Sequence, residues 1–303
     1  MCGIACLTDI NNFHLLSSMS NLLVHRGPDD SGEFLDRENG VALAMRRLAI
    51  IDLSGGKQPM SNEDESIWVV CNGEIYNSPE LRQQLSAKGH RFKTRNSDVE
   101  VLLHLYEEKG TDLLQDLNGM YAFVIYDKKK GILFGARDRI GIKPFYYTLK
   151  NGKLAFASEL KSLLVLPWVS RETDFTSLYH FVSLQFVPAP DSIFRDVKKL
   201  QAGYFFIYKP ADNHFSVHRY WDLDVAHTEE LPVAEWQEII REKLKEAVKR
   251  WTLSDVPIAC SLSGGLDSSS IVGLLAVSGA KDIRTYSLGF ESSHEQECNE
   301  LPL

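Results

Sequence analysis

The chain has 303 residues, 44% of them hydrophobic and 24% charged, which is enough for two globular domains and argues against disorder. Its formal net charge of −8 argues against a general nucleic-acid or anionic-membrane surface. No run approaches the roughly 18 apolar residues of a membrane span, and no basic segment precedes an apolar stretch at the start. We therefore expect a cytoplasmic protein that binds neither membranes nor nucleic acids.

The five cysteines are widely spread and form no CxxC pair: Cys2, Cys6, Cys71, Cys260 and Cys298. An odd number without a pairing motif excludes a disulfide framework and a regular zinc site, and it fits a reducing compartment. We expect no protein-bound metal.

The first two hundred residues mix short strands with helices. Segments rich in β-branched and aromatic residues predict strands at 2–9, 66–74, 121–127 and 131–138. Helices are predicted at 78–89, which begins with Ser-Pro, and at 97–110, where apolar residues recur at helical spacing. Strand pairs interrupted by helices, rather than strictly alternating with them, indicate a layered α+β domain.

The chain changes character between residues 209 and 234. This stretch is polar, contains two prolines and shows little periodicity, which predicts a linker. Beyond it the pattern predicts a helix, a strand, a helix and a strand, at 234–251, 256–262, 268–279 and 283–290. This order is the opening of a βαβ unit in a parallel sheet. Because two strands do not make a domain, we expect this second domain to be truncated.

The sequence SLSGGLDSS, residues 261–269, joins the predicted strand to the predicted helix. Free backbone N–H groups at a helix N-terminus, hydroxyl groups and two glycines without Cβ atoms would suit a phosphate. The loop is neither a Walker A motif nor a GxGxxG fingerprint, and SGG alone is equally well explained as an ordinary tight turn.

Cys2 directly follows the initiator methionine and precedes an apolar, strand-like run. If Met1 were removed, Cys2 would carry a free α-amine with a pKa of about 8, close to the unperturbed thiol pKa of about 8.5. That amine could act as the thiol's own base. Judged alone, Cys2 is better explained as a small buried residue beside Cys6.

Six segments in chain order resemble the class II glutamine amidotransferase domain: MCGI, HRGPDDSG, MRRLAIIDLSGGKQPM, CNGEIYN, RNSDVEV and ARDRIGIKPFYY. FASELKSL and YWDL further along fit the same domain. The SGGLDSS segment resembles the pyrophosphate loop of the ATP-pyrophosphatase superfamily. Together these segments resemble the glutamine-hydrolysing asparagine synthetases over essentially the whole chain.

The resemblance implies an α+β fold, the αββα sandwich of the N-terminal-nucleophile hydrolases, for a glutaminase domain over residues 2–208. A linker would follow at 209–234, and residues 235–303 would be the beginning of a parallel-sheet α/β synthetase domain.

The resemblance also implies residue roles in the glutaminase domain. Cys2 would be the nucleophile, and Asn72 with Gly73 would form the oxyanion hole. Glutamine would be bound by Arg47, Leu48, Ala49, Ile50, Ile51, Asn72, Gly73, Glu74 and Asp98. Within this set, Arg47 would hold the α-carboxylate and Asp98 the α-ammonium. The loop His25–Pro28 would shape the site.

Each of these residues has a simpler explanation when taken singly. Arg47 could be a surface arginine and Asp98 a helix-start acid. Asn72-Gly73 alone is typical of a hairpin turn.

For the second domain the resemblance implies ATP contacts, with Mg²⁺ accompanying ATP as a substrate and no tightly bound cofactor. The implied residues are Ser261, Ser263, Gly264, Gly265, Asp267, Ser268, Ser269 and Leu288. Family members usually carry an aliphatic residue where this chain has Ser261.

The implied reaction has two halves. Cys2 would release ammonia from glutamine, and ATP would adenylylate the β-carboxylate of aspartate so that ammonia displaces AMP. A homodimer is compatible with the resemblance. Because only the start of the second domain is present, we expect weak glutamine hydrolysis and no asparagine synthesis from this chain.

Three alternatives remain open at this point. A related amidotransferase could amidate a carboxylate other than that of aspartate. The chain could be a fragment with glutaminase activity only. It could also be a non-catalytic remnant, although every expected glutaminase residue is present. Other amidotransferases with this N-terminal domain, such as glucosamine-6-phosphate synthase, carry no SGGLDSS loop.

Overall fold

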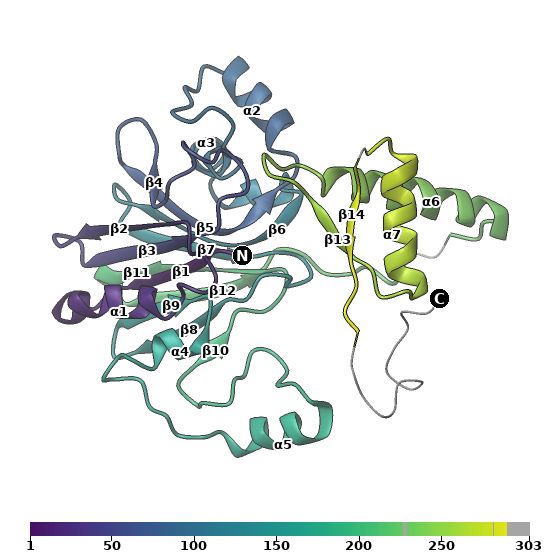
Figure 1. Cartoon of the computed structure of the whole chain (residues 1–303). Helices are drawn as coiled ribbons and strands as arrows, with labels where there is room; N and C mark the ends of the chain where they lie inside the picture. The colour runs from purple at the N-terminus through teal and green to yellow at the C-terminus, as the bar shows by residue number, and fades with distance from the viewer. Residues whose placement is uncertain (227–228, 281, 290–303) are drawn as a thin grey trace. The chain divides into compact units, whose positions relative to one another are not determined.

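The computed structural model describes residues 1–226, 229–280 and 282–289, and the chain falls into two compact units, Met1–Leu223 and Asp224–Leu303 (Figure 1). Each unit is described by itself.

The first unit is built on two six-stranded sheets. One has the order β10-β8-β9-β1-β3-β2 and all its neighbouring strands are antiparallel. Its strands are β1 (Gly3–Leu7), β2 (Asp30–Asp36), β3 (Val41–Arg47), β8 (Tyr146–Lys150), β9 (Lys153–Ala157) and β10 (Lys198–Lys199). The helices η1 (Ile10–Leu15), α1 (Leu16–Asn21) and α4 (Leu160–Leu163) pack on it.

The second sheet has the order β12-β11-β7-β6-β5-β4 and is also antiparallel throughout. Its strands are β4 (Met60–Ser61), β5 (Ile67–Ile75), β6 (Gly119–Asp127), β7 (Ile132–Arg137), β11 (Tyr204–Lys209) and β12 (His214–Arg219). The helices α2 (Ser78–Ala87), α3 (Glu100–Lys109) and η2 (Gly110–Gln115) belong to its outer layer, while α5 (Phe175–Leu184) and η3 (Pro210–Asp212) lie in connections.

Strand periodicity explains why the layers are helix, sheet, sheet and helix. In β6, Tyr121 and Phe123 belong to the core cluster shared with α2 and α3, whereas Ala122 and Val124 belong to the cluster between the two sheets. Successive side chains of a strand point to opposite faces, so a strand buried on both faces reads as a continuous apolar run. β1 behaves in the same way. This αββα arrangement confirms the predicted fold class.

The helices and strands predicted for the first two hundred residues are present. The predicted helices at 78–89 and 97–110 appear as α2 and α3, and the four predicted strands appear as β1, β5, β6 and β7. In α3 the apolar residues that set the helical spacing are buried.

The predicted linker at 209–234 is wrong in its first part. Residues 214–219 form β12, which pairs with β11 in the register Lys209↔His214 to Tyr204↔Arg219. Phe215 packs beside Tyr147 and Phe206 and so ties this edge strand to the core. The polar residues that alternate with Phe215 hid the strand pattern, because an edge strand exposes much of its length.

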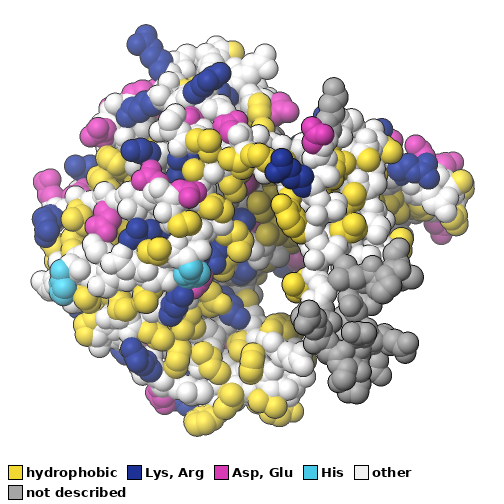
Figure 2. Space-filling model, in the orientation of Figure 1, with side chains coloured by type: hydrophobic (Ala, Val, Ile, Leu, Met, Phe, Trp, Pro, Cys, Tyr) yellow, Lys and Arg dark blue, Asp and Glu magenta, His cyan; other side chains and the backbone are white. Residues whose placement is uncertain are grey.

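The second unit contains α6 (Val233–Arg250), β13 (Ala259–Ser261), α7 (Leu266–Val277) and β14 (Arg284–Tyr286). β13 and β14 are parallel, as predicted, with Cys260 opposite Thr285. Within the described part of this unit, Leu275 is the one buried apolar side chain. Apolar side chains lie on the unit's surface in Figure 2, and Leu266 on α7 is 83% exposed.

Among the described residues, every helix is too short or too polar to cross a membrane.

Candidate active site

Cys2 is held at the entry to β1 by contacts on both sides. Its Sγ lies 3.6 Å from the carbonyl oxygen of Leu48 and accepts the Leu48 N–H at 3.4 Å. Its backbone carbonyl accepts a hydrogen bond of 2.8 Å from Arg26 Nε, and Arg26 Nη1 is 2.9 Å from Glu159. The antiparallel pairing of β1 with β3 places Gly3 opposite Arg46 and thereby brings Cys2 to the Leu48 backbone. The loop His25–Pro28 therefore fixes the backbone of Cys2 through Arg26.

Burial raises the pKa of the Cys2 thiol and lowers the pKa of the α-amine of Met1. The hydrogen bond from Leu48 opposes the first effect only in part. A buried thiol is a poor nucleophile at neutral pH unless a base removes its proton.

One cavity brings together residues from four segments of the chain. It is lined by Cys2, Arg47, Leu48, Ile50, Ile51, Gly56, Gln58, Cys71, Gly73, Glu74, Ser97, Asp98 and Val99. Most residues expected to bind glutamine are in this set, and their roles remain predictions. Two expected residues are not. Ala49 donates its N–H to Asp29 at 2.9 Å, and Asn72 is 1% exposed and not among the lining residues.

Arg47 supplies a fixed positive charge. It is only 5% exposed, and its guanidinium donates to three carbonyl oxygens of the following loop, those of Ile51 (2.8 Å), Asp52 (2.8 Å) and Leu53 (3.1 Å). A Cβ at Gly56 would come within 3.0 Å of the guanidinium, so the glycine makes room for it. Since a guanidinium has five N–H groups, Nε–H and one Nη1–H have no partner among the described residues and are available to a ligand. Arg47 is thus no surface arginine.

Glu74, which is partly buried, and Asp98, which is buried, supply two carboxyl groups. Burial is the main cause that raises the pKa of Glu74 and of Asp98, and for Glu74 the neighbouring Asp98 adds to it. Asp98 Oδ2 accepts the Ile75 N–H at 2.8 Å, which favours its charged form. Two acids that compete for a proton create a site in which an added cation, such as an ammonium group, is favourable.

Asn72 and Gly73 lie in the middle of β5, opposite Ala122 and Tyr121, so the hairpin-turn explanation is wrong. A Cβ at Gly73 would lie under 3.0 Å from the Met120 carbonyl oxygen, which means that only glycine fits this close strand pairing. Asn72 is 1% exposed, and within the described part of the chain neither its Nδ2 nor its Oδ1 has a hydrogen-bond partner. Such a group costs about 1–3 kcal/mol and calls for a functional explanation.

The loop 261–269 is stabilised by its own hydroxyl groups. Ser263 Oγ and Ser268 Oγ are 3.1 Å apart, and Gly265 N–H donates to Ser263 Oγ at 3.3 Å. Gly264 has φ +89°, which explains why a glycine stands there. α7 begins directly afterwards, so Asp267 and Ser269 lie in its first turn. Ser261 ends β13, and Leu288 follows β14 with 77% of its surface exposed. ATP binding here remains a prediction.

Residues 1–221 match the family model of the glutamine amidotransferase domain. The chain belongs to this family. Residues 239–302 match the asparagine synthase family.

Similar proteins cover most of the chain. Asparagine synthetase [glutamine-hydrolyzing] 1 of Bacillus subtilis is 42% identical over 286 residues, which are 94% of this chain and 44% of that protein. The amidase chry2 of Gibberella zeae is 37% identical over 86% of this chain and 38% of its own length. The chain thus spans about half the length of such relatives or less.

The fold is shared with more distant amidotransferases. The solved structure of glutamine phosphoribosylpyrophosphate amidotransferase from B. subtilis has a TM-score of 0.52 at 16% identity, and it covers 94% of this chain and 65% of its own.

Two further polar residues have no role assigned from the sequence motifs: Gln58, which lines the cavity, and Lys143, which is not among the lining residues but whose charge interacts with Glu74 and Cys2. Lys143 is 4% exposed, and burial lowers its pKa while Glu74 and the Cys2 sulfur oppose that effect. Gln58 lines the cavity, and its Oε1 accepts the Cys71 N–H at 2.7 Å. The available signal for Lys143 was a lone lysine within the apolar run IGIKPFYY.

Proposed function

We propose that this amidotransferase hydrolyses glutamine at Cys2 and that the ammonia serves the ATP-dependent amidation of a carboxylate, aspartate being the first choice. The observation that carries the first half is the charge pattern of the cavity. A thiol, the cation of Arg47 and the acids Asp98 and Glu74 line one small space. This set complements a free amino acid whose side chain reaches the sulfur.

In the proposed reaction the Cys2 sulfur attacks the side-chain amide carbon of glutamine. The negative charge that develops on oxygen would be stabilised by the Asn72 amide and the Gly73 N–H. The C–N bond then breaks, ammonia leaves, and a γ-glutamyl thioester remains. Water hydrolyses the thioester to glutamate and restores the thiol.

The base in this proposal is the α-amine of Cys2 itself, which becomes free when Met1 is removed. The raised pKa of the thiol makes such a base necessary, and the amine on the same residue is the nearest available.

For the second half we propose that ATP, with Mg²⁺ as its counterion, binds at the loop 261–269. Hydroxyl groups of Ser263 and Ser268 and the start of α7 suit a pyrophosphate group. Adenylylation of the acceptor carboxylate would release pyrophosphate, and attack by ammonia would then release AMP. Because several relatives are named asparagine synthetase, aspartate is the preferred acceptor in this proposal. Another relative is named an amidase, so an acceptor with a different carboxylate is the alternative.

Glutamate formation from glutamine tests the first half. Purified protein should produce glutamate, and Cys2→Ala should produce none, whereas Cys260→Ala in the second unit is the control that should retain activity. Turnover by Cys2→Ala at the wild-type rate would overturn the proposal. Exchange of labelled pyrophosphate into ATP, with aspartate compared to other acids, tests the second half.

A further inference from the structure

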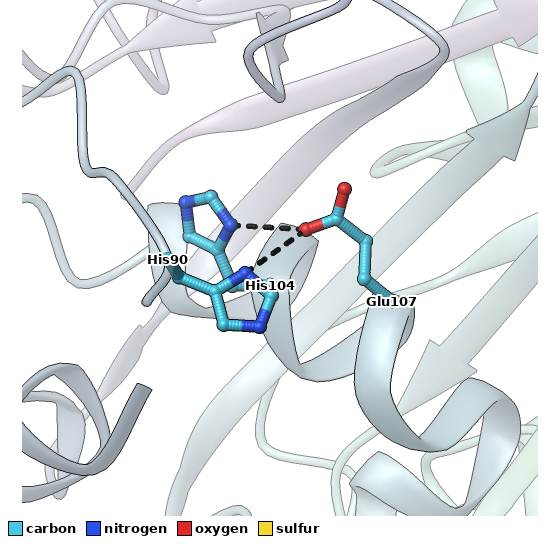
Figure 3. Close-up of side chains that lie close together, drawn as sticks. All are labelled: His90, His104 and Glu107. Atoms are coloured by element: carbon cyan, nitrogen blue, oxygen red, sulfur yellow. Dashed lines mark hydrogen bonds and ion pairs between the residues drawn. The ribbon is translucent and has the colours of Figure 1, made fainter. Parts of the chain in front are cut away.

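A cluster of histidine and glutamate side chains lies between α2 and α3, and none of its members lines the Cys2 cavity. It consists of His90, His104 and Glu107 (Figure 3). The Nδ1 atoms of His90 and His104 both point at one oxygen, Oε2 of Glu107, at 3.4 Å and 3.0 Å.

The backbone fixes these positions. Gly89, with φ +101°, ends α2, and the His90 N–H then donates to the Leu85 carbonyl at 3.2 Å. His104 and Glu107 are three residues apart on α3 and so share a face of that helix. The edge contact of the Phe92 ring with His104, at 4.5 Å between centroids, holds the buried imidazole in place.

We propose that His90, His104 and Glu107 bind a divalent transition-metal ion, with Zn²⁺ as the best match, and that Glu63 is the fourth ligand. Ligand bonds of about 2.0–2.1 Å at tetrahedral angles separate neighbouring donor atoms by about 3.3 Å, close to the separations of both histidine nitrogens from Glu107. Glu63 Oε2 lies 4.0 Å from His104 Nδ1, and its side chain is 41% exposed, so a small rotation would complete the site.

One of the two histidines has the outer contact that is typical of a metal centre. The far nitrogen of His90, Nε2, is 3.1 Å from Glu108 Oε1, whereas that of His104 has no hydrogen-bond partner among the described residues and lies 3.9 Å from Glu100 Oε1. The second oxygen of Glu107 accepts a hydrogen bond of 2.8 Å from Asn62. Metal-binding histidines usually donate their other N–H to a carboxylate, which turns the free nitrogen lone pair toward the ion.

This proposal departs from the expectation of no protein-bound metal, which is based on the cysteine spacing and does not consider the histidines. His90 follows the end of α2 and His104 lies within α3, and the packing of α2 on α3 brings them together. The bound ion would join the end of α2 to α3 and stabilise the first unit without taking part in glutamine chemistry.

The test is Zn²⁺ binding by purified, chelator-treated full chain, measured by isothermal titration calorimetry, with Co²⁺ absorption as a report of tetrahedral geometry. We expect one ion per chain and a rise in the unfolding temperature. His90→Asn should abolish specific binding, and Glu108→Gln should weaken it by about 10–100-fold because it removes an outer contact. His218→Asn changes an exposed histidine that contacts Ser216, and this control should bind as wild type.

Circular dichroism and urea unfolding of the metal-free variants serve as the folding check, and both variants should remain folded. The proposal is overturned if the wild-type chain binds no Zn²⁺ saturably, or if both folded variants bind it with wild-type affinity. In that event the cluster is only a set of ion pairs. This result is independent of whether Cys2 hydrolyses glutamine.

Discussion

Replacing Asn72 by alanine should abolish most activity while leaving the fold as stable as before or more so. Asn72 is 1% exposed, and within the described part of the chain its amide group has no hydrogen-bond partner. In the proposed reaction this amide acquires a partner only when negative charge develops on the substrate oxygen. Activity and stability should therefore respond in opposite directions.

The magnitudes follow from the two roles. Loss of one oxyanion-hole donor lowers kcat by about 10²–10³. Removing the unpaired amide relieves a desolvation cost of about 1–3 kcal/mol. The cavity left by alanine, on the order of 30 Å³ at about 24 cal/mol per Å³, costs about 0.7 kcal/mol. The net change in the free energy of unfolding is then a gain of about 0–2 kcal/mol.

The assay pairs urea unfolding without glutamine with initial rates of glutamate formation. Asn62→Ala is the matched control, because Asn62 is also buried but donates to Ser66 (3.2 Å) and Glu107 (2.8 Å) and accepts from Ile67 (3.0 Å). The control should lose about 1–3 kcal/mol of stability and keep its kcat. Wild-type kcat in Asn72→Ala, or a stability loss as large as that of the control, would refute the reasoning.

Three further predictions concern the same cavity. Gly73→Ala should lose activity, and its free energy of unfolding in urea should fall by about 1–3 kcal/mol, because the added Cβ would collide with the Met120 carbonyl oxygen. A free energy of unfolding equal to that of the wild type would contradict the close pairing of β5 and β6. Glu74→Gln should stabilise the chain at pH 8 but not near pH 4. Burial raises the pKa of Glu74 from 4.5 to about 8 in the folded chain, so between these two pH values the folded chain binds more protons than the unfolded chain. The stability of the wild-type chain therefore falls as pH rises from 4.5 to 8, by at most about 5 kcal/mol. Urea unfolding at both pH values measures this, and an equal effect at both would count against it. A cleavable extension before Cys2 should abolish glutamine turnover until a protease frees the Cys2 amine; activity of the uncleaved protein would exclude that amine as the base.

Much of the first unit could be predicted because its signals are local. Buried strands such as β6 read as apolar runs, and the glycine at the end of α3 marks its boundary. The residues of the cavity lie in short contiguous motifs whose order along the chain is informative. Asn72-Gly73 shows the limit of such motifs, since the same dipeptide that typically makes a hairpin turn lies here within β5.

Features that depend on packing could not be predicted in this way. β12 is an edge strand with polar residues on one face, and only the contact of Phe215 with the core distinguishes it from a linker. The burial of Lys143 is likewise set by the strands around it rather than by its neighbours in sequence. A charged side chain such as Lys143, which is 4% exposed, indicates a functional site only once the fold shows that it is buried.

Three sets of polar groups lack full pairing among the described residues; two of them line the cavity, and the third, Asn72, precedes the lining residue Gly73. Arg47 retains two N–H groups for a ligand, Asp98 and Glu74 compete for a proton, and Asn72 lacks a partner within the described residues. A free glutamine would pair with all three, through its α-carboxylate, its α-ammonium and the oxygen of its side-chain amide. A glutamine residue inside a peptide has neither of the first two groups and would leave buried charges unpaired, which a polar site rejects strongly.

The binding of glutamine should also depend on pH. An ammonium group favours the charged form of the carboxylates, so its binding would release protons from Asp98 and Glu74. The affinity for glutamine should therefore increase as pH rises through the raised pKa values of these two residues. The same polar groups that cost the free protein stability would thus provide its selectivity for the free amino acid.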